Sequence, residues 1–139
     1  MSKMIYINLP VNDLAVATRF YEAIGCEKNE EFSDHQSSSM VWSDTITFQL
    51  LTNDYFATFT PKKIADAHAT SEVLLALSRD NRAEVDTIVE AAAATGGKAD
   101  IRKPQDMGWL YTRAFEDPDG HVFEVITADM GAPSAEVKE

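Results

Sequence analysis

The sequence predicts an α+β fold in which one module, a strand followed by a helix and three further strands (βαβββ), occurs twice. Two segments with apolar residues at helical spacing each follow a strand-like segment. These helical segments end at glycine, the first at Gly25 and the second at Gly96-Gly97. Three strand-like segments then follow each predicted helix. No linker or low-complexity stretch separates the halves, so we expect a single domain over residues 1–129.

The first half is expected over residues 3–52. Its first strand alternates apolar residues with more polar ones, and Asn12 or Asp13 then offers an N-cap for the helix. The apolar stripe of this helix consists of Leu14, Ala17, Tyr21 and Ile24. Strands are expected near 26–33, 38–43 and 45–51.

The second half is expected over residues 71–127. A buried strand begins at Glu72 and ends at Leu77, and Asp80 or Asn81 caps the helix that follows. The remaining strands are expected near 98–103, 109–116 and 121–127. Residues 53–70 connect the halves through a short helical turn or two, and residues 130–139 are expected to be a frayed tail.

Composition and charge exclude several kinds of partner. Twelve basic and twenty-three acidic residues give a net charge of −11, which disfavours nucleic acid and anionic membrane surfaces. No run of about 18 apolar residues is present, so no membrane span is expected. The N-terminus lacks a hydrophobic signal region, and one cysteine, Cys26, is typical of a reducing compartment. We therefore expect a cytoplasmic protein.

Glu124 is the residue that most clearly suggests a functional site. Residues 117–120, Asp-Pro-Asp-Gly, predict a tight turn, and both faces of the strand after it are largely apolar. A carboxylate withdrawn from water in this way needs a cation, a metal ion, hydrogen-bond donors or a proton. A four-residue turn would place Arg113 opposite Glu124, whereas a bulge at Gly120 would place Ala114 there and leave open space. The turn chemistry favours the bulge.

The order and spacing of these elements resemble the vicinal oxygen chelate superfamily, which includes glyoxalases, bleomycin resistance proteins and extradiol dioxygenases. The resemblance covers roughly residues 3–127, from INLPVNDLAVATRFYEAIG to FEDPDGHVFEV. It implies that the two modules form a cupped mixed β-sheet with the helices packed outside. It also implies a homodimer, and in some members a metal held by one inward side chain from each of four strands.

The positions that match those four side chains are Tyr6, Gln49, Glu72 and Glu124. Strand alternation independently places each of them on the face opposite an aliphatic row, so we expect them to meet in the cup. The rows are Ile5/Ile7/Leu9, Ile46/Phe48/Leu50, Val73/Leu75/Leu77 and Phe123/Val125. Trp109 is a further candidate for the ligand site, as a stacking wall, although buried aromatic residues more often belong to a core.

Together with this pattern, the resemblance implies two alternative functions. In the first, the protein binds a small polar organic ligand, cationic or rich in hydrogen-bonding groups, without evident catalysis. In the second, Gln49, Glu72 and Glu124 hold a divalent metal (Mn, Mg, Fe, Ni or Zn), and Glu124 transfers a proton in a lyase, isomerase or dioxygenase reaction. No histidine falls at a matched position, which favours the binding protein.

The connection over residues 53–70 has two further features. Lys62-Lys63 reads as a solvent-exposed pair. The aromatic cluster of Tyr55, Phe56 and Phe59 suggests either a lid over the cup or a dimer contact.

Overall fold

The computed structural model describes residues 2–129 and contains nine strands and three α-helices in that range. The first half consists of β1 (Ile5–Val11), α1 (Leu14–Ala23), β2 (Glu27–Asn29), β3 (Ser37–Val41) and β4 (Ile46–Thr52), with a 3₁₀ turn at Glu30–Phe32. The connection contains α2 (Asn53–Phe56) and a 3₁₀ turn at Ala57–Phe59. The second half consists of β5 (Leu75–Ser78), α3 (Arg82–Ala94), β6 (Lys98–Ala99), β7 (Gln105–Asp106), β8 (Leu110–Glu116) and β9 (Val122–Ala128). None of these helices is long and apolar enough to cross a membrane.

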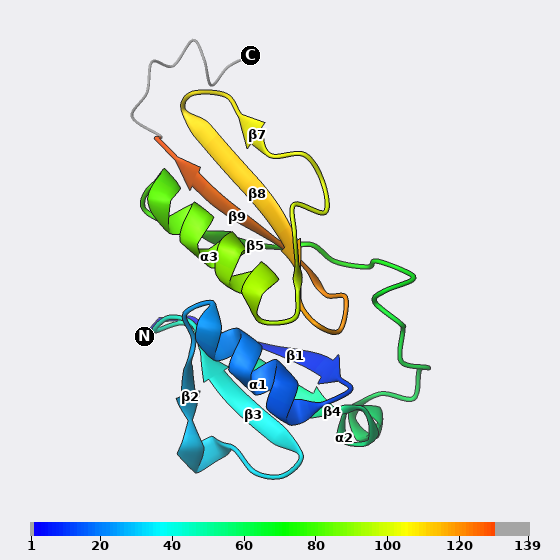
Figure 1. Ribbon diagram of the computed structural model, residues 1–139. Coiled ribbons are helices and arrows are strands. Elements are labelled where there is room, and N and C mark those ends of the chain that lie inside the picture. Colours follow the sequence, from blue (N-terminus) through cyan, green and yellow to red (C-terminus); the bar gives the residue numbers. More distant parts are fainter. Residues whose placement is uncertain (1, 130–139) are drawn as a thin grey trace.

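The two halves repeat one topology, which confirms the predicted βαβββ modules (Figure 1). The strand order is β1-β4-β3-β2 in the first sheet and β5-β9-β8-β6 in the second, where β7 also pairs with β8. In each sheet the first strand runs parallel to the last, and the other pairs are antiparallel. Both sheets are therefore mixed.

Several strand boundaries differ from the expected ones. β5 begins at Leu75 rather than Glu72, because its partner β9 begins only at Val122, after the tight turn. The strand expected over 98–103 ends at Ala99, since Asp100 adopts a positive φ of 53° that turns the chain out of the sheet. The strand expected over 26–33 gives way to the 3₁₀ turn after Asn29. The expected tail at 130–139 lies outside the described residues.

N-capping side chains set the start of both long helices. Of the two candidates that the sequence offers for each helix, Asp13 and Asn81 are the N-caps. Asp13 Oδ1 accepts a hydrogen bond from the Val16 amide at 3.2 Å, and Asn81 Oδ1 accepts one from the Glu84 amide at 2.9 Å. These side chains satisfy amides that have no partner inside the helix. Asp13 and Asn81 therefore occupy equivalent positions in the two modules.

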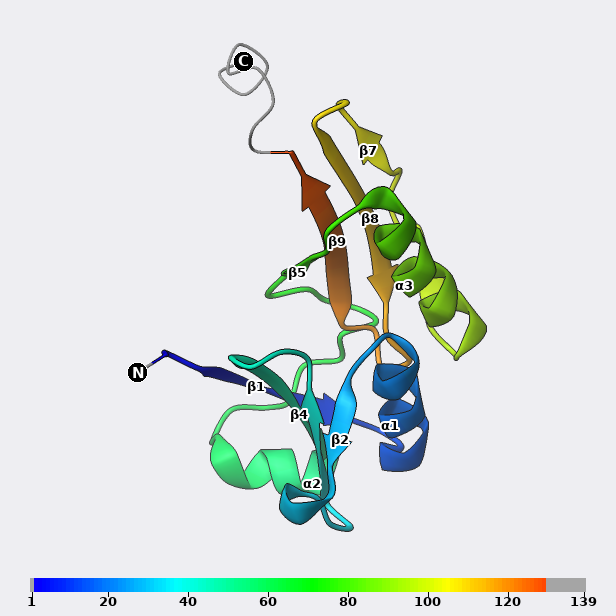
Figure 2. The same ribbon diagram turned by 90° about the vertical axis from the view of Figure 1, so that its left-hand side faces the viewer.

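Both helices pack on the same side of the two sheets, so the halves share one apolar core (Figure 2). Aromatic rings join the halves: Tyr21 and Phe48 from the first half both contact Phe123, with ring centroids 6.0 and 5.5 Å apart. The predicted aliphatic rows are buried at their inner ends. At their outer ends Ile5 and Val73 are 54% and 56% exposed, contrary to expectation.

The predicted tight turn at 117–120 lies where the two halves meet. Asp117 is 1% exposed, and its Oδ2 accepts a hydrogen bond from the Tyr21 hydroxyl at 2.7 Å. Its Oδ1 accepts hydrogen bonds from the amides of Asp119 and His121 at 2.9 and 2.8 Å. The Asn12 amide donates to Asp119 Oδ1 at 2.8 Å. The turn is therefore held by side-chain and backbone groups from both halves.

We predict that Tyr21→Phe lowers the free energy of unfolding by about 1–3 kcal/mol, because it leaves a buried carboxylate oxygen without its donor. Urea denaturation would measure the change as a shift in the midpoint urea concentration, with the m-value unchanged. Tyr111→Phe is the matched control, since it removes a hydroxyl that donates to Asp86 at 2.7 Å in a less buried place. Its expected loss is below about 1 kcal/mol. Equal losses in the two variants would contradict the prediction.

Candidate functional site

Glu124 lies in the middle of β9 between two small residues. Its neighbours across the sheet are Ala114 on β8 and Ala76 on β5, which confirms the bulged register over the four-residue alternative. Neighbouring residues in paired strands point to the same face, so the two alanines leave space around the carboxylate. Arg102 fills part of that space, and its guanidinium lies 2.9 Å from Glu124 Oε2. The compensating group for this carboxylate is therefore a cation.

Arg113, the alternative partner of Glu124, is engaged elsewhere. Its guanidinium forms ion pairs with Asp100 at 2.7 Å and with Asp86 at 2.9 Å. The hydrogen bonds that the guanidinium donates to these carboxylates, the one to Asp100 first, hold the pKa of Arg113 above its usual range. The pKa of Asp86 is lowered, chiefly by the hydrogen bond from the Tyr111 hydroxyl. This network joins α3 to β8 and leaves Glu124 to Arg102.

Gln49 occupies the position on β4 that corresponds to Glu124 on β9. Its neighbours across the first sheet are Asn8 and Ser39, just as Ala76 and Ala114 flank Glu124. The Oε1 atom of Gln49 is buried and accepts no hydrogen bond from the described residues. The two modules thus present one amide and one carboxylate at equivalent places, but in two different sheets.

The capping residues show which position in the second half corresponds to Tyr6. Leu74 precedes Asn81 by the same number of residues as Tyr6 precedes Asp13. Leu74, rather than Glu72, is therefore the equivalent of Tyr6, and Glu72 lies in the connection before β5. Tyr6 itself is 56% exposed, and its hydroxyl lies 3.8 Å from the sulfur of Met4.

Trp109 lies apart from Glu124. It immediately precedes β8, at the end of the second sheet opposite the tight turn. It lines a hollow with Arg82 and Tyr111, in which the Arg82 guanidinium stacks on the Tyr111 ring at 4.7 Å. Arg82 is also paired with Asp106 at 2.7 Å. These contacts make the neighbourhood of Trp109 a polar network that does not include the other predicted site residues.

The side chains at the matched positions do not fit a divalent metal ion. No group of three or more His, Cys, Asp or Glu in residues 2–129 is arranged to hold one. Tyr6 and Leu74 offer poor or no ligands, and Glu124 already has a cationic partner. No chemical step is therefore assigned to a metal.

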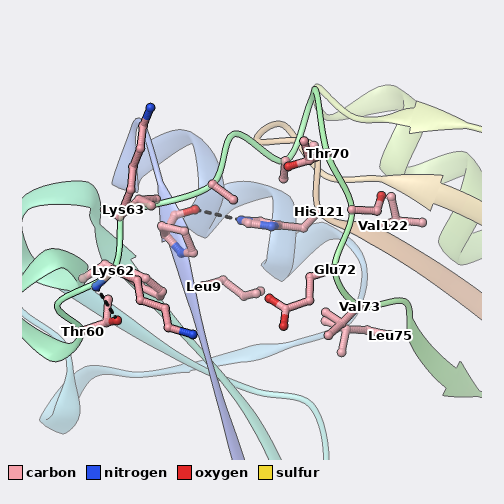
Figure 3. A pocket seen from close by; sticks show the side chains of 17 residues that line it. Leu9, Thr60, Lys62, Lys63, Thr70, Glu72, Val73, Leu75, His121 and Val122 are labelled. Carbon is pink, nitrogen blue, oxygen red and sulfur yellow. Dashed lines mark hydrogen bonds between the residues drawn. The ribbon is translucent and has the colours of Figure 1, made fainter.

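A pocket of about 320 Å³ lies where the connection crosses from the first sheet to the second (Figure 3). We call it the junction pocket. Its apolar walls come from the end of β1, from α2 and the connection, and from the starts of β5 and β9. These wall residues are Leu9, Phe56, Ile64, Val73, Leu75 and Val122. Of the predicted site residues, Glu72 lines this pocket, whereas Tyr6, Gln49, Trp109 and Glu124 do not.

Charged side chains enter the junction pocket from two sides. The carboxylate of Glu72 and the amine of Lys62 both point into the hollow, while the amine of Lys63 points away from it (Figure 3). The ring of His121 is held by a hydrogen bond of 2.8 Å between its Nε2 and the carbonyl of Pro10. The pocket thus offers one cation and one anion over an apolar surface. Lys62 and Lys63 are both exposed, as the sequence predicts, but no pattern in the sequence distinguishes the lysine whose amine points into the pocket.

The backbone of the connection packs closely against the tight turn at Gly120. Gly120 has a positive φ of 91°, and a Cβ atom there would lie 2.6 Å from the His68 amide nitrogen and 2.7 Å from the carbonyl carbon of Ala67. Only glycine tolerates both the conformation and the contact. The junction pocket therefore depends on this residue for its shape.

Comparisons with known proteins agree with the fold. A model of the glyoxalase/bleomycin resistance protein/dioxygenase superfamily matches residues 3–125. None of the curated proteins matches. A hypothetical protein from S. aureus is 25% identical with a TM-score of 0.76, over 92% of this chain and 95% of that one.

Two further solved structures are similar at lower identity. A glyoxalase/bleomycin resistance protein/dioxygenase family enzyme from Burkholderia phytofirmans PsJN is 19% identical with a TM-score of 0.73, over 91% of this chain and 99% of that one. The fosfomycin resistance protein FosX from Mesorhizobium loti is 20% identical with a TM-score of 0.67, over 94% and 96%. At these identities the likeness concerns the fold.

We predict that Gly120→Ala lowers the free energy of unfolding more than Gly108→Ala does. Gly108 also has a positive φ, of 83°, but a Cβ atom there meets nothing within 4 Å. Gly108→Ala, the control, should therefore lose only about 1–2 kcal/mol of unfolding free energy, the cost of a positive φ for alanine. Gly120→Ala should lose this amount and, in addition, the cost of the clash between its Cβ atom and the connection. Urea denaturation of both variants would measure the difference. A loss in Gly120→Ala no larger than in the control would show that the connection yields freely.

Proposed function

Given that this chain belongs to the glyoxalase/bleomycin resistance protein/dioxygenase superfamily, we propose that it binds a small organic molecule in the junction pocket without a metal ion. The observation that carries this proposal is the pocket itself. Its volume of about 320 Å³ falls within the range of small-molecule sites, and its walls are apolar with a few polar groups. That combination holds the body of a ligand by burial and orients it by charge.

Binding is better supported than catalysis by the chemistry of the available groups. The metal-dependent alternative requires ligands that the matched positions do not supply. The thiol of Cys26 is buried, and burial raises its pKa to about 12, so it is a poor nucleophile at neutral pH. Glu124, the expected proton-transfer group, is paired with Arg102 outside the junction pocket.

We also propose that the protein forms a homodimer through the outer ends of its edge strands. β1 and β5 are each the terminal strand of their sheet, with one side unpaired in the described structure. Large apolar side chains at or beside these strands are half exposed or more: Met4, Ile5, Tyr6, Val73 and Leu74. Exposed apolar edge strands favour association, and a second copy would cover the same patch on both chains.

We predict that benzyl alcohol, an uncharged probe, binds in the junction pocket with a Kd on the order of millimolar. Two-dimensional amide NMR would show shifts at residues that line the pocket. Val122→Trp should abolish binding by filling the space. Ile126→Trp is the control, because Ile126 lies on the same face of β9 outside the pocket.

The response to chelation separates this proposal from a metal site. Binding of benzyl alcohol should be unchanged after treatment with EDTA. Loss of binding upon chelation, or shifts that persist in Val122→Trp, would contradict the proposal.

We predict that the protein sediments as a dimer. Leu74→Lys should shift it to monomer, because it places a charge among the exposed apolar side chains at β1 and β5. Met107→Lys is the control, since Met107 is 60% exposed but lies in the β7–β8 segment. Sedimentation velocity over a range of concentrations would measure both. A wild-type monomer, or a dimer that persists in Leu74→Lys, would refute this interface.

A further inference from the structure

We propose that the natural ligand of the junction pocket is a small zwitterion with an apolar side group, such as an apolar amino acid. This inference rests on the proposed function and adds the chemical class of the ligand. Its basis is the pair of opposite charges, Lys62 and Glu72, that enter the pocket from different sides (Figure 3).

Neither of these two charged groups has an ion-pair partner in residues 2–129. The ion pairs found there involve other residues, and Lys62 and Glu72 are not within 4.0 Å of each other. On β9, by contrast, Glu124 already has Arg102 as its partner. Lys62 and Glu72 are therefore free to bind complementary groups, a carboxylate on Lys62 and an ammonium on Glu72.

Apolar residues separate the two charges. Leu9 lies between Lys62 and Glu72, Leu75 lies close to Glu72, and Val122 lines the pocket next to His121 (Figure 3). A ligand that reaches both charges must cross this surface, so a molecule with an apolar group gains burial that a purely polar one does not. A singly charged ligand would pair with only one of the two protein charges.

The charge of the whole protein also favours a neutral ligand over an anion. A net charge of −11 repels anions at long range. A zwitterion carries no net charge, so it avoids that repulsion while still offering a carboxylate to Lys62. A simple cation would be attracted by the whole protein but repelled by Lys62 within the pocket.

Four ligands that share one phenyl group would test the inference: L-phenylalanine, 3-phenylpropionate, 2-phenylethylamine and benzyl alcohol. L-phenylalanine carries both charged groups, 3-phenylpropionate only the carboxylate and 2-phenylethylamine only the amine. Benzyl alcohol carries no charge. At low ionic strength we expect L-phenylalanine to bind about threefold to tenfold more tightly than either singly charged ligand, since both protein charges remain in contact with solvent. Isothermal titration calorimetry or NMR titration would measure the four Kd values.

Charge-removing variants would assign each end of the ligand. Lys62→Met should weaken L-phenylalanine and 3-phenylpropionate about threefold to tenfold and leave 2-phenylethylamine unweakened. Glu72→Gln should weaken L-phenylalanine and 2-phenylethylamine and spare 3-phenylpropionate. Lys63→Met is the matched control, because its amine points out of the pocket, and it should change none of the four by more than about twofold.

The outcomes separate this inference from the proposed function. If benzyl alcohol binds in the pocket but L-phenylalanine binds no more tightly, the zwitterion is wrong and the binding function stands. If L-phenylalanine binds more tightly but Lys63→Met and Lys62→Met weaken it equally, the assignment of the carboxylate to Lys62 is wrong. If no ligand of the series perturbs the pocket, both proposals fail.

Discussion

The arrangement of the two halves depends on the buried carboxyl group of Asp117. It is 1% exposed and accepts three hydrogen bonds, one from the Tyr21 hydroxyl of the first half and two from amides of its own turn. A buried carboxylate without such donors would cost several kcal/mol. Burial raises the pKa of Asp117 above its ordinary value even so, which shows that desolvation outweighs the donors in its titration. One of the three donors to the Asp117 carboxyl group thus comes from the first half and joins the turn to it.

The junction pocket follows from the same constraint. Because the turn is held against the first half, the backbone of Ala67 and His68 packs closely against Gly120. The His121 ring also forms its hydrogen bond with the carbonyl of Pro10. The connection then contributes one wall of the pocket, opposite residues at the end of β1 and the start of β9. A glyoxalase-type fold in which residues 2–129 assemble no group of metal ligands thus still contains a ligand-sized cavity, which lies where its two modules meet.

Much of the fold could be predicted because its signals are local. Helix caps, glycine stops and strand alternation depend on neighbours in sequence, so the duplicated module and its order were predicted correctly. The Asp-Pro-Asp-Gly turn likewise predicted the bulged register that places Ala114 opposite Glu124. The partner of Glu124 was not predictable. Arg102 reaches it from the segment that follows Asp100, where a positive φ ends the strand, and no pattern in the sequence indicates that turn.

The sequence by itself determined the elements, their order and the residues that cap them, because backbone and side-chain preferences act over a few residues. Only the tertiary structure decided which polar groups share a site. It put Gln49 and Glu124 in different sheets, placed Glu72 in the connection and brought Lys62 to face Glu72 across Leu9. The positions of these groups depend on how two sheets and a long connection pack around one buried turn. Packing between segments that are distant in the sequence produces no repeating pattern of residues from which it could be predicted.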